Sequence, residues 1–482
     1  MTLRVIAAGL AAGMFAGGAS AAPGCTEIVQ QYLADKATDV VCFHSQDLTT
    51  VNPVTTPANN SLPGVVPFAF TPITDRGVIS NGPAPITHAV PGFQVEGYFA
   101  DDPEHQARFV LRFPDTWNGR LVVAGASGTR SEYNGDFAWS DYVLSQGYAY
   151  ASQNKGVFNL KLSAATDPLG CRLNPDSPTF VHFFDNDPAK PFTQWTDYML
   201  RTAKLAQGAV KFTYHQPARY TYAVGTSNGG YQVRRAIEAA PDLFDGGVDW
   251  EGTFIDAAGP NILIDLPPAI ANYPAYAASG FDATSAAAQA IRNAGYPPDI
   301  VNAGGKSLWQ QYSGSFWEVT ACQWQKRFDP TYDTYGAGLG NYDYLGRITL
   351  PGVFDSVAAV ATTGKIKKPL ITVAGTMDAL LPIQRQARAY EAKVNASRKG
   401  NNDERNAQYR LYEVQNGNHI EAYKFLFPQL ELIQPHAQKA FDLLVQHVES
   451  KAALPESQCI PHAGTISAAP AEPGHCANLF VP

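Results

Sequence analysis

The amino-acid sequence predicts an α/β fold, in which a mostly parallel central sheet is flanked by helices and interrupted by one large lid insertion. Residues 120–125, 137–146 and 148–152 read as strand, helix and strand within about 30 residues, which is the pattern of a parallel βαβ unit. Further strand-like and helix-like runs alternate over residues 193–251 and 368–451. At 482 residues, the chain is long for one domain and suits a single α/β core that carries an insertion.

The composition is that of a compact, loop-rich globular protein. Charged residues make up 16% of the chain and aromatic residues 11%, with 35 Pro and 41 Gly, which argues against disorder and against a coiled coil. The formal net charge of −8 disfavours nucleic acid or an anionic membrane as a partner. Beyond the N-terminus, no run reaches about 18 uninterrupted apolar residues, so we expect no integral membrane association.

The N-terminus has the pattern of a secretory signal peptide over residues 1–21. Arg4 precedes a short apolar run, and Ala19-Ser20-Ala21 forms an A-x-A cleavage site. We therefore expect the mature protein to be exported, either to the periplasm or out of the cell.

Six cysteines follow the predicted cleavage site, and an even number in an exported protein predicts up to three disulfides. Fifteen pairings of six cysteines are possible. We favour Cys25–Cys42 and Cys459–Cys476, which would pin the two ends of the chain, and Cys171–Cys322, which would join two long insertions. No cysteine pair has C-x-x-C spacing and no H-E-x-x-H occurs, so no metal site is expected.

The chain before the insertion divides into an N-terminal extension, residues 22–95, and the first part of the core, residues 96–256. From residue 48 onward the extension is rich in Pro, Thr, Asn and Gly, and we expect this part to lie over the core as an irregular segment. Gly97–Phe99 and Ala107–Phe113 are predicted to pair as antiparallel strands. The other predicted core elements are strands at 120–125, 148–152, 220–226 and 244–251 and helices at 137–146, 193–214 and 231–240.

Residues 257–361 separate two predicted core strands, and so long an excursion is best explained as a lid. Its aromatic residues, such as Trp309 and Trp317, are interpreted as core rather than as a substrate platform. Residues 453–482 form a tail that a disulfide is expected to pin. The core resumes over residues 362–452, with strands at 368–375 and 409–414 and helices at 384–395 and 435–451.

Residues 219–230 form a strand-like run that ends on G-x-S-x-G, with Ser227 at the centre of the motif. A stretch of helical period follows at once. Strand, glycine-flanked serine and helix form the context that a nucleophile elbow requires. Gly225 and Gly229 fit this interpretation, because a side chain at either position would collide with neighbouring backbone in so tight a turn. The motif alone also occurs by chance in plain glycine-serine turns, and it is the strand–helix context that favours a nucleophile.

A serine nucleophile needs a base to take its proton and an acid to orient that base. In folds with this elbow, both follow the serine in the chain, each on a loop after a core strand. Asp378 follows the first strand of the resumed core, and His419 follows the next one. The remaining histidines after Asp378 fall in the terminal helix or in the tail. Asp249 and Glu251, which follow an earlier strand, compete with Asp378 for the role of the acid.

Two backbone N–H groups are expected to form an oxyanion hole. Asn228 comes directly after the serine, at the N-terminus of a helix, where an N–H group can hold negative charge. The second donor should come from the turn after the strand at 120–125, at Ala126 or Ser127, although this turn has no HGGG-type run. Lys155, in Ser-Gln-Asn-Lys-Gly, is interpreted equally well as structural or as functional.

With these motifs in place, the chain resembles a known group of proteins. Gly225–Gly230, Gly147–Gly156 and Leu243–Val248 are similar to segments of secreted 3-hydroxybutyrate-oligomer hydrolases and of the tannase/feruloyl-esterase family. Both groups have the α/β-hydrolase fold with a large lid, and both cleave carboxylic esters. The resemblance covers about residues 120–252 and 369–422.

The resemblance implies that Ser227, Asp378 and His419 form a catalytic triad. The chain also departs from the tannases, which place a cysteine beside both the serine and the histidine and join the two by a disulfide. Thr226 and Asn418 stand at those places here. A calcium loop of the tannase type is not apparent in the lid either. The resemblance therefore favours the oligomer hydrolases.

The function predicted from the sequence is an exported serine carboxylic-ester hydrolase that acts through an acyl-enzyme on a small or oligomeric ester, hydroxyalkanoate oligomers included, without a cofactor. A tannase- or feruloyl-type esterase is one alternative. A prolyl-oligopeptidase-like serine peptidase is another, because its elbow also reads Ser-Asn-Gly-Gly, but the about 95 residues before the first predicted strands are too few for the propeller of that family. A non-catalytic binding protein on the same fold is the third. The oligomeric state stays open.

Overall fold

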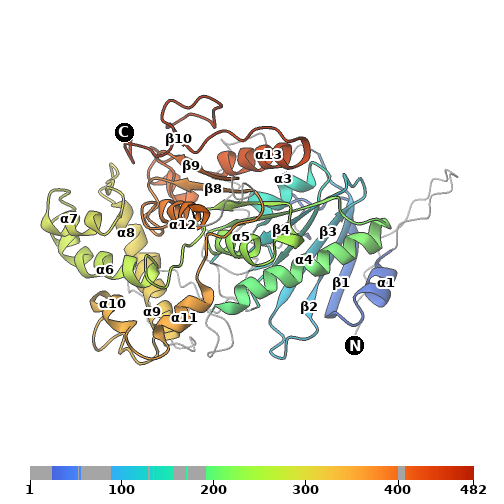
Figure 1. Cartoon of the computed structure of the whole chain (residues 1–482), viewed down its shortest axis with the longest axis horizontal. Helices are drawn as coiled ribbons and strands as arrows, with labels where there is room; N and C mark the ends of the chain where they lie inside the picture. The colour runs from blue at the N-terminus through green and yellow to red at the C-terminus, as the bar shows by residue number, and fades with distance from the viewer. Residues whose placement is uncertain are drawn as a thin grey trace.

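The structure is a computed structural model, shown in Figure 1. It describes residues 24–52, 54–55, 88–128, 131–133, 135–156, 170–171, 192–399 and 408–482. The signal peptide predicted at residues 1–21 lies outside these ranges, as does much of the predicted N-terminal extension. Within the described residues, a ten-stranded sheet has the strand order β1-β2-β3-β5-β4-β6-β7-β8-β9-β10.

The sheet is mostly parallel, which confirms the predicted fold class. Neighbouring strands from β5 through β4 to β10 are parallel, while β1, β2 and β3 form an antiparallel edge against β5. The strands are β1 (Ala37–Ser45), β2 (Gly92–Phe99), β3 (Arg108–Pro114), β4 (Arg120–Gly125), β5 (Ala149–Gln153), β6 (Tyr220–Thr226), β7 (Gly246–Trp250), β8 (Leu370–Gly375), β9 (Tyr409–Val414) and β10 (Gln458–Ile460).

The central strands form because their sequences suit burial on both faces. Every residue of β8, Leu-Ile-Thr-Val-Ala-Gly, is buried, and β4 is buried from its second residue onward. Near-continuous apolar runs of this kind are typical of parallel strands that helices cover on both sides. The strands predicted at 120–125 and 409–414 have the same bounds in the structure.

Helices cover both faces of the sheet (Figure 1). On one face, apolar side chains of α4 (Thr193–Tyr214), α5 (Asn228–Ala239) and α12 (Ala387–Lys399) join one buried cluster with the strands. On the other face, α3 (Asp141–Leu144) and α13 (Gln434–Ser450) do the same. The bounds of α4 are those predicted from its amphipathic period. No helix in the described part of the chain combines the length and the apolar character needed to cross a bilayer.

Some elements differ from the sequence analysis or are missed by it. The helix predicted at 137–146 is instead a π-helical turn, Asp136–Ser140, that leads into the short α3. β1 is not predicted, yet it lies within residues 22–95 and pairs antiparallel with β2. The tail also contributes a strand, because β10 pairs in parallel with β9. Both ends of the chain therefore extend the sheet, and the predicted domain limits stay predictions.

The insertion at 257–361 is largely helical and lies beside the sheet as a lobe (Figure 1). Asn261, Ser285 and Ser307 each cap a helix there by accepting a hydrogen bond from a backbone N–H near its start. Trp309 and Trp317, like most aromatic side chains of this lid, are buried in one cluster with side chains from loops of the core, which confirms their interpretation as core. Its helices are α6 (Ile262–Ala278), α7 (Ala286–Asn293), α8 (Leu308–Tyr312), α9 (Glu318–Phe328), α10 (Tyr344–Arg347) and α11 (Val353–Val360).

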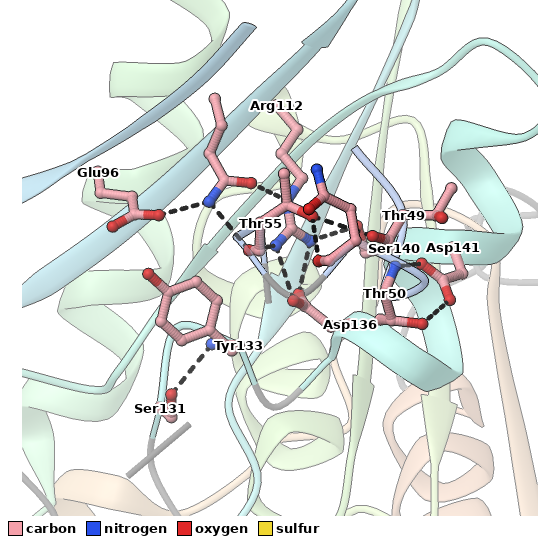
Figure 2. Close-up of polar contacts among 12 residues, drawn as sticks. Thr49, Thr50, Thr55, Glu96, Arg112, Ser131, Tyr133, Asp136, Ser140 and Asp141 are labelled. Carbon is pink, nitrogen blue, oxygen red and sulfur yellow. Dashed lines mark hydrogen bonds and ion pairs between the residues drawn. The ribbon is translucent and has the colours of Figure 1, made fainter. Parts of the chain in front are cut away.

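A buried polar network fastens the N-terminal segment to the sheet (Figure 2). The guanidinium of Arg112 on β3 donates to both carboxylate oxygens of Asp136 at 2.7 Å and to the amide oxygen of Gln94 on β2 at 2.8 Å. It also donates to the backbone oxygen of Thr55 at 2.8 Å. The side chains of Arg112 and Asp136 are fully buried, so each charge depends on the other to compensate for its lost hydration.

All six cysteines are paired, and the pairing is the one favoured from the sequence. Cys25–Cys42 joins the start of α1 (Cys25–Glu27) to β1. Cys171–Cys322 joins the segment before α4 to α9 in the lid, and Cys459–Cys476 joins β10 to the end of the tail. Disulfides therefore pin the segments near both ends of the described chain.

Two of the disulfides offer a matched test, because each joins cysteines 17 residues apart. The double variants Cys25→Ser/Cys42→Ser and Cys459→Ser/Cys476→Ser should each lose about 3 kcal/mol of the free energy of unfolding, since the entropy that a cross-link removes from the unfolded chain depends on loop length. Urea titration beside the wild type measures the losses. Losses that differ by more than about 2 kcal/mol would show that native contacts, rather than loop closure, set these contributions.

Candidate active site

Ser227 lies at the sharp turn between β6 and α5. Its backbone has φ 58° and ψ −123°, a conformation that residues with side chains rarely adopt. The Ser227 N–H donates to the backbone oxygen of Trp250 at 2.9 Å, and the Ser227 carbonyl accepts from the Tyr231 N–H at 3.1 Å. Backbone strain of this kind costs about 1–3 kcal/mol and persists only where the surroundings impose it.

Glycines permit the close approach of backbones around this turn. A Cβ on Gly225 would lie 2.3 Å from the carbonyl oxygen of Gly229, and a Cβ on Gly229 would lie 2.5 Å from the carbonyl oxygen of Gly125. Both distances are far shorter than van der Waals contact. β4, β6 and the start of α5 therefore meet only because no side chain stands between them.

The structure brings together the three residues predicted as nucleophile, base and acid. His419 and Asp378 lie on the loops after β9 and β8, and both are buried. The Nε2 of His419 lies 2.9 Å from the Oγ of Ser227, and its Nδ1 lies 2.8 Å from the Oδ2 of Asp378. The Oδ1 of Asp378 accepts the N–H groups of Leu380 and Leu381 at 2.8 and 2.7 Å. Ser227, His419 and Asp378 thus form one connected chain of hydrogen bonds.

Of the two competing acids, Asp249 is engaged in an ion pair with Arg234. Its carboxylate accepts hydrogen bonds from the Arg234 Nε at 2.5 Å, the Thr372 hydroxyl at 2.8 Å and the Gly252 N–H at 2.6 Å. The side chains of Arg234 and Asp249 are both fully buried. This ion pair therefore holds α5 against the sheet.

The other competitor, Glu251, stands beside the base. Its Oε2 lies 3.5 Å from the Nδ1 of His419, which is longer than a hydrogen bond, and its Oε1 accepts the Gly375 N–H at 2.9 Å. Burial, and then repulsion by Asp378, raise the pKa of Glu251 to about 8. Burial by itself lowers the pKa of His419, but the charge of Asp378 and the hydrogen bond to it outweigh burial and raise this pKa to about 9.

Glu251, Asp378 and His419 also form a group, within the described part of the chain, that could hold a metal ion. One ligand atom from each lies within 4.8 Å of the others, and all three residues are buried. The 2.8 Å contact between His419 and Asp378 is a hydrogen bond, which a metal ion between these two atoms would break. The arrangement therefore suits proton transfer better than metal binding.

The residues predicted as oxyanion donors lie at the elbow, and one of their N–H groups is already engaged. Asn228 begins α5, where the first N–H groups have no acceptor within the helix. The Ala126 N–H donates to the Oε1 of Gln232 at 2.8 Å, so a side chain of α5 occupies it. Ser127 is the next residue of the turn. The contact of Gln232 with Ala126 has no sequence signal, because no motif marks a residue that far into the helix.

The side chain of Lys155 contacts the turn after β4, which contains Ser127. Its Nζ donates to the carbonyl of Ser127 at 2.7 Å and lies 4.3 Å from the centre of the Trp195 ring. The Lys155 backbone is also left-handed, with φ 62°. These contacts favour the structural interpretation of Lys155, in which a buried ammonium group fixes the position of the turn after β4.

Hydrogen bonds join the lid to the loops that carry Asp378 and His419. Tyr312 from α8 donates its hydroxyl to the Oδ1 of Asn418 at 2.8 Å and accepts the Ile420 N–H at 3.3 Å. The indole N–H of Trp317 donates to the carbonyl of Ala379 at 2.7 Å. The two contacts of Tyr312, with Asn418 and Ile420, flank His419, and the contact of Trp317 with Ala379 follows Asp378. No sequence motif marks these contacts, because each joins residues far apart in the chain.

A mostly parallel sheet with a serine on a strand–turn–helix elbow defines the α/β-hydrolase fold. A comparison with a solved esterase structure agrees. An esterase from Aspergillus oryzae has a TM-score of 0.50 and 14% identity, with 87% of this chain and 89% of that chain covered. Feruloyl esterase B from Aspergillus oryzae has a TM-score of 0.47 and 13% identity, with 89% and 91% covered. At these identities the likeness is one of fold alone.

A narrower likeness comes from the sequence. Residues 346–479, which include Asp378 and His419, match the family model of the 3HB-oligomer hydrolases. A D-(-)-3-hydroxybutyrate oligomer hydrolase of Burkholderia thailandensis is 35% identical over 128 residues, covering 25% of this chain and 18% of that protein. A Burkholderia mallei enzyme of the same description matches equally. The match spans less than a fifth of the length of these relatives. It confirms the resemblance to the oligomer hydrolases.

The close approach of backbones at the elbow predicts that a methyl group added there lowers protein stability more than one added in the lid. Gly225→Ala places a Cβ 2.3 Å from the Gly229 oxygen, so the free energy of unfolding should fall by about 1–3 kcal/mol or more. Gly314→Ala, in the lid, is the matched control, because a Cβ there meets no atom within 4 Å, and alanine in this helical turn should leave stability unchanged or raise it by up to about 1 kcal/mol. Denaturant unfolding of both variants measures the difference. Equal stabilities would contradict the close approach of the backbones.

Proposed function

We propose that this protein is a serine carboxylic-ester hydrolase with Ser227, His419 and Asp378 as its catalytic triad. The observation that carries the proposal is the chain of hydrogen bonds from the serine hydroxyl through the imidazole to the carboxylate, with contacts of 2.9 and 2.8 Å. A serine hydroxyl is a weak nucleophile by itself. Such a chain supplies both the base that takes its proton and the charge that orients the base.

In the acylation step, the Oγ of Ser227 attacks the ester carbonyl while its proton moves to the Nε2 of His419. Asp378 keeps the Nδ1–H of the imidazole in place and stabilises the imidazolium that forms. The carbonyl oxygen gains negative charge, and the backbone N–H groups of Asn228 and Ser127 donate hydrogen bonds to it. The ester C–O bond then breaks, and Nε2 gives its proton to the departing alcohol.

Water completes the cycle. His419 takes a proton from the attacking water and returns it to the Ser227 oxygen as the bond to the acyl group breaks. The reaction consumes one ester and one water and yields one acid and one alcohol, so it needs no cofactor. In this mechanism Ala126 is not an oxyanion donor, since Gln232 occupies its N–H, and it contributes by holding the turn in place.

The substrate class we propose is oligomers of 3-hydroxyalkanoates, in which an ester bond joins the hydroxyl of one unit to the carboxyl of the next. Support comes from the match of residues 346–479 to the oligomer-hydrolase family and from the activity that names the matched relatives. Aromatic esters of the tannase and feruloyl type are the alternative, and the assay below separates the two classes.

We also propose that the protein works outside the cytoplasm, either secreted or in the periplasm. Its three disulfides support this location, because disulfides persist in oxidising compartments. Residues 1–21 support it as well, through their signal-peptide pattern.

Hydrolysis assays test the proposed function. The purified protein should cleave p-nitrophenyl acyl esters and 3-hydroxybutyrate oligomers, and Ser227→Ala should lower kcat by about 1,000-fold or more, because the nucleophile is lost. Ser397→Ala is the control, since that hydroxyl donates only to carbonyls around α12. Cleavage of feruloyl esters in preference to the oligomers would select the aromatic class. Cleavage of peptide p-nitroanilides alone would indicate a peptidase, and no turnover by the folded protein would indicate a binding protein.

The pH dependence of ester cleavage follows from the protonation of His419. Only the neutral imidazole can take the serine proton, and Asp378 raises the pKa of His419 to about 9 after burial has lowered it. kcat/KM should therefore rise with pH and level off above about pH 9. A profile measured from about pH 6 to about pH 10 checks this. A plateau already reached at about pH 6 would contradict it.

A further inference from the structure

Two carboxyl groups face one nitrogen of His419, and the triad uses only one of them. Asp378 accepts the Nδ1–H at 2.8 Å, while the Oε2 of Glu251 lies 3.5 Å from the same nitrogen. Glu251 follows a different strand, β7, and its backbone is left-handed with φ 52°. This conformation is uncommon for a residue with a side chain, so the surrounding structure must hold Glu251 in it.

Glu251 is fixed from both its backbone and its side chain. Its N–H donates to the Val373 oxygen at 2.9 Å, and its Oε1 accepts the Gly375 N–H at 2.9 Å. The side chain is 1% exposed, and Oε2 has no hydrogen-bond partner among the described residues. Burying a polar oxygen without a partner costs free energy. One carboxylate oxygen of Glu251 thus accepts a backbone hydrogen bond, and the other lies beside the imidazole without a hydrogen-bond partner among the described residues.

The charge of Asp378 decides the protonation of Glu251. Burial first and repulsion by Asp378 second raise the pKa of Glu251 to about 8, so Glu251 holds a proton below that pH. If Asp378 lost its charge, the second cause would vanish and Glu251 would ionise at lower pH. The Oε2 would then need to move by less than about 1 Å to accept the Nδ1–H.

Other ionisable groups near Glu251 and Asp378 do not compete for the Nδ1–H of His419. The carboxyl of Glu421 accepts two backbone N–H groups at the start of α13, at 2.5 and 2.8 Å. Burial raises the pKa of Glu421 to about 7, and the Glu421 charge adds to the repulsion on Glu251. Tyr312 and Tyr296 stay neutral, because burial raises the pKa of both hydroxyls well above the usual range.

We propose that Glu251 is a second positioning residue for His419, able to accept the Nδ1–H when a neutral side chain replaces the carboxylate at position 378. The inference rests on the ester-hydrolase function proposed above. In the exchange, Glu251 releases its proton to water, and the imidazole keeps its Nδ1–H but donates it to Oε2 in place of Oδ2. The hydrogen bonds of Glu251 go to Val373 and Gly375, and its Oε2 faces His419, so it acts through the imidazole.

Four proteins test the inference: the wild type, Glu251→Gln, Asp378→Asn and the double variant. Each amide keeps a carbonyl oxygen for the backbone N–H groups that its acid accepted, so the loops should hold their shape. Asp378→Asn should retain activity that rises with pH as Glu251 ionises. Adding Glu251→Gln should lower kcat by a further tenfold or more, on the order of a positioning residue's effect.

In the wild-type background, Glu251→Gln should change the plateau kcat by less than about threefold, because Asp378 still accepts the Nδ1–H at 2.8 Å. It should also move the rising limb of the pH profile to lower pH, because an ionised Glu251 no longer raises the pKa of His419. A purely structural role would leave the pH profile where it is. If the double variant is no slower than Asp378→Asn and the profile of Glu251→Gln does not move, the inference is overturned.

Glu421→Gln in the Asp378→Asn background is the matched control. Glu421 is another buried carboxyl of raised pKa beside the same loops, and its hydrogen bonds go to α13 rather than to the imidazole. The control should keep the residual activity of Asp378→Asn within about twofold. A loss equal to that caused by Glu251→Gln would show that any buried carboxyl serves, which contradicts a specific role for Glu251.

Proton NMR separates this inference from the proposed function, because it needs no substrate. An imidazole N–H donated to a buried carboxylate gives a strongly downfield resonance. Asp378→Asn should keep that resonance above about pH 8, and the double variant should lose it. If the wild type cleaves no ester but shows this pattern, the proposed function fails and the role of Glu251 stands. Absence of the resonance from Asp378→Asn at every pH refutes the role of Glu251, whatever the activity.

Discussion

Three backbone segments approach one another at the nucleophile turn more closely than side chains would allow. The carbonyl of Gly229 stands where a Cβ of Gly125 or Gly225 would be, so β4, β6 and the start of α5 can meet only with glycine at these positions. The same approach holds Ser227 in a conformation with φ 58° and presents its hydroxyl at the end of the sheet. The imidazole of His419 lies 2.9 Å from that hydroxyl.

The parallel sheet supplies the rest of the site. β7, β8 and β9 end at the same edge, and the residues after them place Glu251, Asp378 and His419 within 4.8 Å of one another. The lid then fixes the outer side of two of these loops, through the hydroxyl of Tyr312 and the indole of Trp317. The packing of the lid and the position of His419 are therefore coupled, although Ser227, Asp378 and His419 all lie outside the lid.

Burial on both faces and chain order explain what could be predicted from the sequence. The central strands are continuous apolar runs, and the positions of Asp378 and His419 after two of them follow from the order of acid and base in this fold. β1 has no such signal: its burial alternates irregularly, and its pairing with β2 contains a register shift near Asp39. The sequence marks Glu251 as a competing acid but does not predict that its side chain lies beside the imidazole, because periodicity ends at β7. The left-handed turn at Glu251 sends its side chain toward the imidazole, while Asp249, two residues earlier, pairs with Arg234.

Two acids lie beside one imidazole, and they differ in the number of hydrogen bonds that they accept. Asp378 accepts the imidazole N–H and two backbone N–H groups, whereas Glu251 accepts one backbone N–H. A single donor does not offset the burial of Glu251, so the pKa of this acid is raised to about 8. A neutral second acid avoids burying a second charge, and it adds no repulsion to the first. In the mechanism proposed above, a positive imidazole favours ionisation of Glu251, because its charge lowers the pKa of that acid. Glu251 therefore offers a second carboxyl group beside the nitrogen that already donates to Asp378.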